Sequence, residues 1–188
     1  MSQYFKHFPK IKYNGVMCRD ITRRVDFSQT SLEDTYAFLP YTIMADDRPE
    51  DVAHFYYGDV KHTWIVYLSI RAVDPYYDWP LSYDNFNRFF IKKYAEMANA
   101  TGYEVISWGQ NTTITDNVVH YKRLDENQDI ISVDTFTLDP DINASEWEAV
   151  RYYDYEVEIN DNKRAIELID RKYLSKMERD FRRLMNVG

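Results

Sequence analysis

The stretch Arg48–Trp79, RPEDVAHFYYGDVKHTWIVYLSIRAVDPYYDW, constrains the fold most, because its prolines and its glycine limit where helices begin and end. Pro49 suits the first turn of a helix, where a missing N–H is not needed. Apolar residues follow at helical spacing, and Gly58 supplies the left-handed residue that ends many helices. The apolar repeat that begins at Trp64 predicts a second short helix, to about Arg71.

The segments on either side of the two predicted helices complete a compact pattern. Tyr36–Met44 is predicted as a strand, and Asp74–Pro80 as a turn, because two prolines exclude helix there. The order is therefore strand, helix, tight turn, helix and turn. We expect Pro49, Ala53, Gly58 and Trp64 to be structural residues of this arrangement.

This order resembles the LysM module, a small βααβ unit, and more closely the baseplate wedge subunit of contractile-tailed phages, which carries an embedded LysM-like unit. The resemblance covers Tyr4 to about Ala98 and is looser from Thr101 onward. The positions that carry it are Arg48, Pro49, Glu50, Ala53, Tyr57, Gly58, Trp64, Asp74, Pro75, Tyr76, Trp79, Lys93 and Tyr94.

The resemblance implies a structural protein of the virion tail baseplate, made in the host cytoplasm and present in several copies around the tail axis. Its implied partners are the core helical bundle of the wedge, a sheath-initiating wedge protein and the tail hub. An alternative is a LysM-type module that binds N-acetylglucosamine polymers or peptidoglycan through loops Met44–Arg48 and Ala72–Trp79. The missing export signal and the large remainder outside the LysM-like unit argue against this alternative.

Composition excludes several classes of function. The net charge of −8 disfavours generic binding to nucleic acid, and no apolar stretch is long enough to span a membrane. The single cysteine, Cys18, excludes an internal disulfide and a multi-cysteine zinc site. No pattern of nucleophile, base, phosphate loop or metal ligands is present, so we expect no enzyme, no cofactor and no metal.

The N-terminal residues 1–35 are predicted to form an extended arm with a turn at Asn14-Gly15. A capping-box pattern also predicts a short helical turn within Phe27–Glu33. Residues 36–98 are expected to form the LysM-like unit with a flanking helix, Tyr83 to about Ala98, that Gly102 ends.

Residues 99–188 are expected to form an antiparallel β layer followed by a C-terminal helix, so the predicted fold class is α+β. The layer carries twelve acids and one base between Leu124 and Asp161, a charge of −11 that suits either solvent or a basic neighbour. The predicted strands are Tyr103–Trp108, Asn117–Leu124, Ile130–Leu138, Val150–Ile159 and Arg164–Ile169.

The last predicted element is the helix Arg171–Met185, which has one apolar stripe and basic residues on its other faces. We expect Tyr173 and Met177 to be buried on the chain's own domain, and Phe181 to Met185 to lie closer to a neighbour. The predicted partner-binding residues are Trp64, Tyr76, Tyr77, Trp79, Arg179, Phe181, Arg182 and Leu184.

Overall fold

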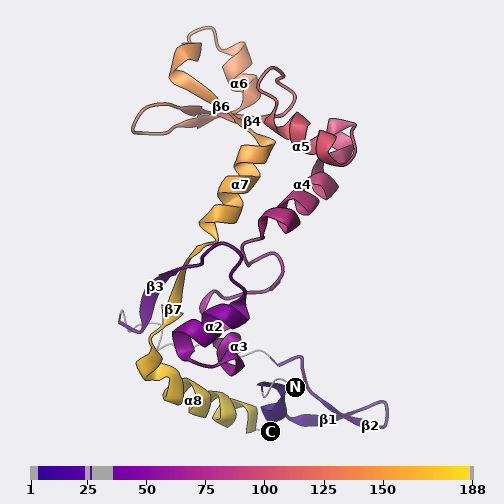
Figure 1. Cartoon of the computed structure of the whole chain (residues 1–188), viewed down its shortest axis with the longest axis vertical. Helices are drawn as coiled ribbons and strands as arrows, with labels where there is room; N and C mark the ends of the chain where they lie inside the picture. Colours follow the sequence, from indigo (N-terminus) through magenta and orange to yellow (C-terminus); the bar gives the residue numbers. More distant parts are fainter. Residues whose placement is uncertain (1–3, 24–25, 27–35, 187–188) are drawn as a thin grey trace. The chain divides into compact units, whose positions relative to one another are not determined.

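The computed structural model describes residues 4–23, 26 and 36–186 (Figure 1). It divides into two compact units, which are considered separately: unit 1 is Met1–Trp79 with Arg164–Gly188, and unit 2 is Pro80–Lys163. In this division the last strand and the C-terminal helix belong with the first part of the chain. The predicted helical turn within Phe27–Glu33 lies outside the described residues.

Unit 1 is built on a two-stranded antiparallel sheet whose strands come from opposite ends of the sequence. Strand β3, Phe38–Thr42, pairs with β7, Ala165–Ile169, with Tyr41 opposite Ile166 (Figure 1). Two helices follow β3: α2, Pro49–Tyr57, and, after the short 3-10 turn Val60–His62, α3, Thr63–Ser69. The order is thus strand, helix, helix, strand, with unit 2 inserted before the last strand.

The boundaries of α2 confirm the prediction made from proline and glycine. The helix begins at Pro49, and Gly58 follows its last residue with φ 83°, where a side chain would be strained. The first turn is capped by Asp51, whose carboxylate accepts the Arg48 N–H at 3.1 Å.

The core of unit 1 lies between the sheet and the helix pair. Tyr57 donates its hydroxyl hydrogen bond to the Ile169 carbonyl at 3.0 Å, which joins α2 to β7. The fully buried residues of this core are Val52 and Ala53 from α2, Ile65 and Val66 from α3, and Leu168 from β7.

The two ends of the chain complete unit 1. Near the N-terminus a 3-10 turn, Tyr4–His7, precedes the hairpin of β1, Lys10–Tyr13, and β2, Val16–Arg19. The turn at Asn14-Gly15 is confirmed by this hairpin. At the other end, the 3-10 turn Arg171–Tyr173 leads into α8, Leu174–Asn186, so a helix is confirmed there.

Unit 2 consists of four helices and a small antiparallel sheet, together with short turns. The long helix α4, Tyr83–Ala98, has the predicted bounds, although Asn99, at φ 46°, ends it rather than Gly102. The sheet order is β5-β4-β6, and the main remaining elements are α5, Tyr103–Gln110; β4, Val118–Arg123; β5, Ile130–Ile131; α6, Val133–Leu138; β6, Trp147–Arg151; and α7, Tyr152–Asn162.

Three of the five strands predicted for this half of the chain are wrong in whole or in part. Tyr103–Trp108 lies in α5, most of Val150–Ile159 lies in α7, and Ile130–Leu138 is a two-residue strand followed by α6. Aromatic and β-branched residues favour strands in isolation, but burial of a helical face overrides that preference. The fold class remains α+β, as predicted.

Two of the segments predicted as strands are helical because α5 and α7 pack on α4. Gly109 of α5 lies against the buried ring of Phe90, and Tyr153 of α7 meets the same ring at 5.1 Å between centroids. The buried carboxylate of Glu156 accepts hydrogen bonds from Lys93 and Tyr94, both at 2.6 Å. These contacts need helical spacing in α7.

The last predicted strand, Arg164–Ile169, is confirmed as β7, but its partner lies outside the antiparallel layer expected within residues 99–188. It pairs with β3, more than a hundred residues away. The asparagine and aspartate residues just before it lie at the end of helix α7.

Candidate functional site

Unit 1 has a cluster of aromatic side chains where α3, α8 and the N-terminal segment meet. The rings of Trp64 and Phe181 have centroids 4.8 Å apart, and Tyr4 stacks on Phe181 at 5.0 Å with planes 15° apart. Phe8 and Met185, each 2% exposed, pack in the same cluster. This aromatic cluster attaches both ends of the chain to the helix pair.

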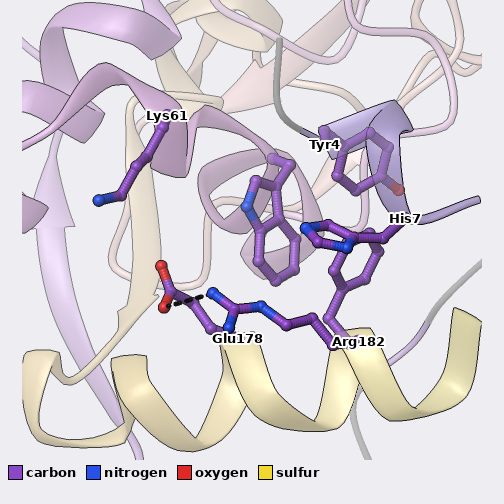
Figure 2. Close-up of a pocket in the computed structure, with 7 residues that line it drawn as sticks. Tyr4, His7, Lys61, Glu178 and Arg182 are labelled. Carbon is purple, nitrogen blue, oxygen red and sulfur yellow. Dashed lines mark ion pairs between the residues drawn. The ribbon is translucent and has the colours of Figure 1, made fainter. Parts of the chain in front are cut away.

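A small pocket opens beside the aromatic cluster, entirely within unit 1 (Figure 2). Its volume is about 40 Å³, enough for a few water molecules and too small for a sugar ring. The lining residues are Tyr4, His7, Lys61, Trp64, Glu178, Phe181 and Arg182.

The Glu178 carboxylate at this pocket contacts one residue distant in sequence and one on its own helix. The carboxylate of Glu178 lies 3.0 Å from Nε2 of the buried His62 and 3.5 Å from the guanidinium of Arg182. Figure 2 shows the contact between Glu178 and Arg182 along α8.

Basic side chains lie near His7 at the edge of the pocket. Partial burial lowers the pKa of His7, and the nearby charges of Arg182, Lys6 and Arg19 lower it further. Glu178 also lines the pocket, so its lining carries both signs of charge.

The loop Asp74–Trp79 presents two exposed aromatic rings on a well-braced turn. The Asp78 carboxylate accepts the N–H groups of Val73 and Asp74 at 2.7 and 2.9 Å, and Asp74 accepts the Tyr76 N–H at 3.0 Å. The rings of Tyr76 and Tyr77, 54% and 47% exposed, contact each other edge to face at 5.0 Å. The hydrogen bonds therefore brace the backbone of the turn that carries both rings.

The predicted site residues separate into buried and exposed groups. Pro49 and Ala53 are buried in α2, and Trp79 is buried with its indole N–H donating to the Asp47 carbonyl at 2.9 Å. Trp64 is half-buried, and Phe181 is only 5% exposed. Trp64, Phe181 and Arg182 meet at the pocket, whereas Tyr76, Tyr77 and Trp79 share the loop.

The position of Phe181 requires a correction to the expectation for the C-terminal helix. Met177, Phe181 and Met185 all face the interior of unit 1, and the described N-terminal residues cover the last two of them. Arg179, Arg182 and Leu184 remain on the exposed side, with Leu184 53% exposed. The apolar stripe is thus used for packing, and the outer face is basic.

Several residues of the site were missed by sequence reasoning. Tyr4 and Phe8 belong to an aromatic N-terminal run, and this run was the sequence feature that could have indicated their place in the cluster. His62 and Glu178 have no local signal, because their partnership depends on the packing of α8 against α3.

The described residues contain neither of two other features: a candidate metal-ion site and a helix that could span a membrane. Within residues 4–23, 26 and 36–186, no group of three histidine, cysteine or acidic side chains is placed to hold a metal ion. In the same part of the chain, no helix has the length and hydropathy needed to cross a membrane.

The fold and these surfaces define a class: an α+β protein that exposes a pair of tyrosines on one loop and basic side chains on its C-terminal helix. The chain belongs to the family described as Base plate wedge protein 53, whose model matches residues 3–184 of the 188. It is thus a structural protein of the phage baseplate wedge, located in the virion tail baseplate and associated with other baseplate proteins. A search of curated proteins finds no match. None of these findings supports the N-acetylglucosamine-binding alternative.

Proposed function

We propose that this protein joins neighbouring wedge components around the tail hub of a contractile tail through protein–protein contacts. The observation that carries the proposal is the braced loop Asp74–Trp79, which exposes two tyrosines in a chain that belongs to a baseplate wedge family. Tyrosine is enriched at the energetic centres of interfaces. A ring already held in position loses little conformational entropy on binding.

The outer face of α8 supplies a second contact surface. Arg179, Arg182 and Leu184 lie on its exposed side, while the buried stripe holds the helix on unit 1. Exposed basic residues around an apolar side chain favour association with an acidic partner and accelerate it. The proposed partners are the wedge's core helical bundle, a sheath-initiating wedge protein and the hub, with several copies of the chain around the tail axis.

The strand, helix, helix, strand order of β3, α2, α3 and β7 supports a LysM-like scaffold for these surfaces. In this proposal the scaffold serves adhesion, and neither a reaction nor a cofactor is required. Trp64 and Trp79 have a supporting role in this proposal. Trp64 packs in the aromatic cluster, and Trp79 holds the end of the exposed loop. Synthesis in the host cytoplasm, before incorporation into the virion, is part of the same proposal.

The experiment compares two tyrosine substitutions in a phage that lacks its own copy of the gene. Tyr77→Ser should leave the melting temperature nearly unchanged, and should reduce the yield of complete baseplates by about tenfold, as expected for loss of one interface anchor. Tyr103→Ser is the matched control, because Tyr103 is 78% exposed and lies in unit 2. Equal baseplate yields for the two variants would remove the loop from the interface.

A further inference from the structure

The hairpin formed by β1 and β2 divides into two chemically distinct faces. The register places Ile11 opposite Cys18 and Tyr13 opposite Val16, so these four side chains share one face. The opposite face carries Met17 and the basic side chains Lys10, Lys12 and Arg19. One face is therefore apolar and the other is mainly basic.

The apolar face of the hairpin is open in the structure. Tyr13 and Val16 are each 67% exposed, and Ile11 is 40% exposed. The described contacts that hold the hairpin are at its base, where the Asp20 N–H donates to the Pro9 carbonyl at 2.9 Å and Arg19 donates to the Phe8 carbonyl at 2.7 Å. Among the described elements, the two strands pack mainly on each other.

A hairpin with an exposed apolar face is expected to have low stability by itself. Two strands without a third strand or a packed helix are marginally stable in water. Clustered apolar side chains on an exposed face are typical of interaction sites. The hairpin is anchored firmly at its base to the buried Phe8, so its open faces are presented from a stable support.

The charge of this segment indicates what kind of partner fits it. Residues 4–23 contain five lysines and arginines and a single acid, Asp20, in a chain with a net charge of −8. Asp20 contacts Arg23 at 3.7 Å, on the segment that follows β2. The net negative charge of the chain disfavours nucleic acid, whereas the local basic surface favours a locally acidic protein surface.

We propose that the β1–β2 hairpin docks into an acidic groove with an apolar floor on another baseplate component. Ile11, Tyr13 and Val16 would lie on the floor. Lys10, Lys12 and Arg19, on the opposite face of the hairpin, would pair with carboxylates on the side of the groove that faces the floor. This inference rests on the proposed function and gives that function a third, independent contact surface.

The test of burial uses cysteine labelling with a maleimide. In a Cys18→Ser background, a Val16→Cys variant is labelled as free protein and within purified baseplates. Docking predicts that labelling slows by about tenfold or more in the baseplate, because interface cores exclude solvent. Met97→Cys, on the exposed side of α4, shows whether slowing is general. Equal labelling rates for free and assembled Val16→Cys, or equal slowing at both positions, would overturn the docking of the hairpin.

The partner is identified by attaching a benzophenone to the same cysteine and sequencing the cross-linked peptides. Peptides from an acidic surface of a different baseplate component support the proposal. Peptides from unit 2 of a second copy of this chain, or from a neutral or basic surface, overturn it.

Charge is tested with a matched pair of double variants. Lys10→Glu with Lys12→Glu should reduce incorporation into baseplates by about tenfold, whereas Lys10→Arg with Lys12→Arg should not, because only the first reverses the attraction. Incorporation that is equal for the two variants contradicts an acidic partner. If the wild-type protein is absent from purified baseplates, the proposed function itself fails. If the protein is present but its hairpin is unprotected, only the hairpin inference fails.

Discussion

The imidazole Nε2 of His62 lies 3.0 Å from Oε1 of Glu178, although 116 positions separate the two residues. His62 is only 4% exposed, and its Nδ1 has no hydrogen-bond partner among the described residues. The Glu178 carboxylate is thus the polar contact that compensates for burying this ring, and it connects α8 to the start of α3.

Removal of that carboxylate should destabilise unit 1. Glu178→Ala leaves the buried imidazole without the hydrogen bond, which should lower the free energy of unfolding by about 1–3 kcal/mol. Glu178→Gln keeps a hydrogen-bonding group and should cost less. Urea unfolding measures both, with Asp180→Ala as the control on the same helix. If Glu178→Ala costs no more than Asp180→Ala, the contact does not contribute to stability.

Gly109 is required by close packing in unit 2. A Cβ added at this position would lie 2.5 Å from Cζ of Phe90, whose side chain is completely buried. Gly109→Ala should therefore destabilise the protein by about 1–3 kcal/mol through overpacking. Ser107→Ala, on the exposed side of the same helix, should change the unfolding free energy by less than about 0.5 kcal/mol. Equal stability of the two variants would contradict the packing of α5 against α4.

The two faces of α8 should respond differently to truncation of a side chain. Phe181→Ala removes a buried ring of the aromatic cluster and should cost about 3–5 kcal/mol. Leu184→Ala affects an exposed side chain and should cost less than about 0.5 kcal/mol. In baseplate assembly at a temperature where both are folded, Leu184→Ala should show the larger loss. If Leu184→Ala lowered the melting temperature more than Phe181→Ala, Phe181 would be assigned to the partner surface.

His7 should make stability dependent on pH. Because its pKa in the folded state is lowered, chiefly by burial and then by Arg182, Lys6 and Arg19, the folded state disfavours the protonated ring. Its contribution is therefore fully present above the ordinary histidine pKa of about 6.5 and is lost as the pH falls through that value.

The measurement compares wild type with His7→Gln by thermal unfolding at neutral and mildly acidic pH. The wild type should lose more stability on acidification than the variant, because only the wild type gains a proton at this position. Arg182→Ala should reduce the difference by removing one of the repelling charges. Identical pH profiles for wild type and His7→Gln would show that the ring is not held in a positive environment.

Local signals account for the elements that sequence reasoning predicted correctly. Pro49 and Gly58 define both ends of α2, and Asn14-Gly15 defines the turn of the N-terminal hairpin. A long helix with a strongly periodic apolar face, such as Tyr83–Ala98, is also readable from the residues alone. In each case, the information lies within one or two turns of the chain.

The candidate site was predictable only in part. The exposed tyrosines of the loop Asp74–Trp79 were identified because prolines exclude helix around them. The roles of Trp79 and Phe181 were not, since an aromatic residue suits a core and an interface equally well. Burial, which depends on neighbours from distant segments, separates the two roles.

The helix pair, the N-terminal hairpin turn and the α+β class could be predicted from the residues alone, because these features depend on local propensities and composition. The helices Tyr103–Gln110 and Tyr152–Asn162 depend on packing in three dimensions, because their buried faces pack on Phe90 and Tyr94 of α4. The tertiary structure also decided that β7 pairs with β3. The residues of a strand do not identify the strand with which it pairs. Pairing between segments this distant in sequence is therefore decided by the apolar surface that the folded unit buries.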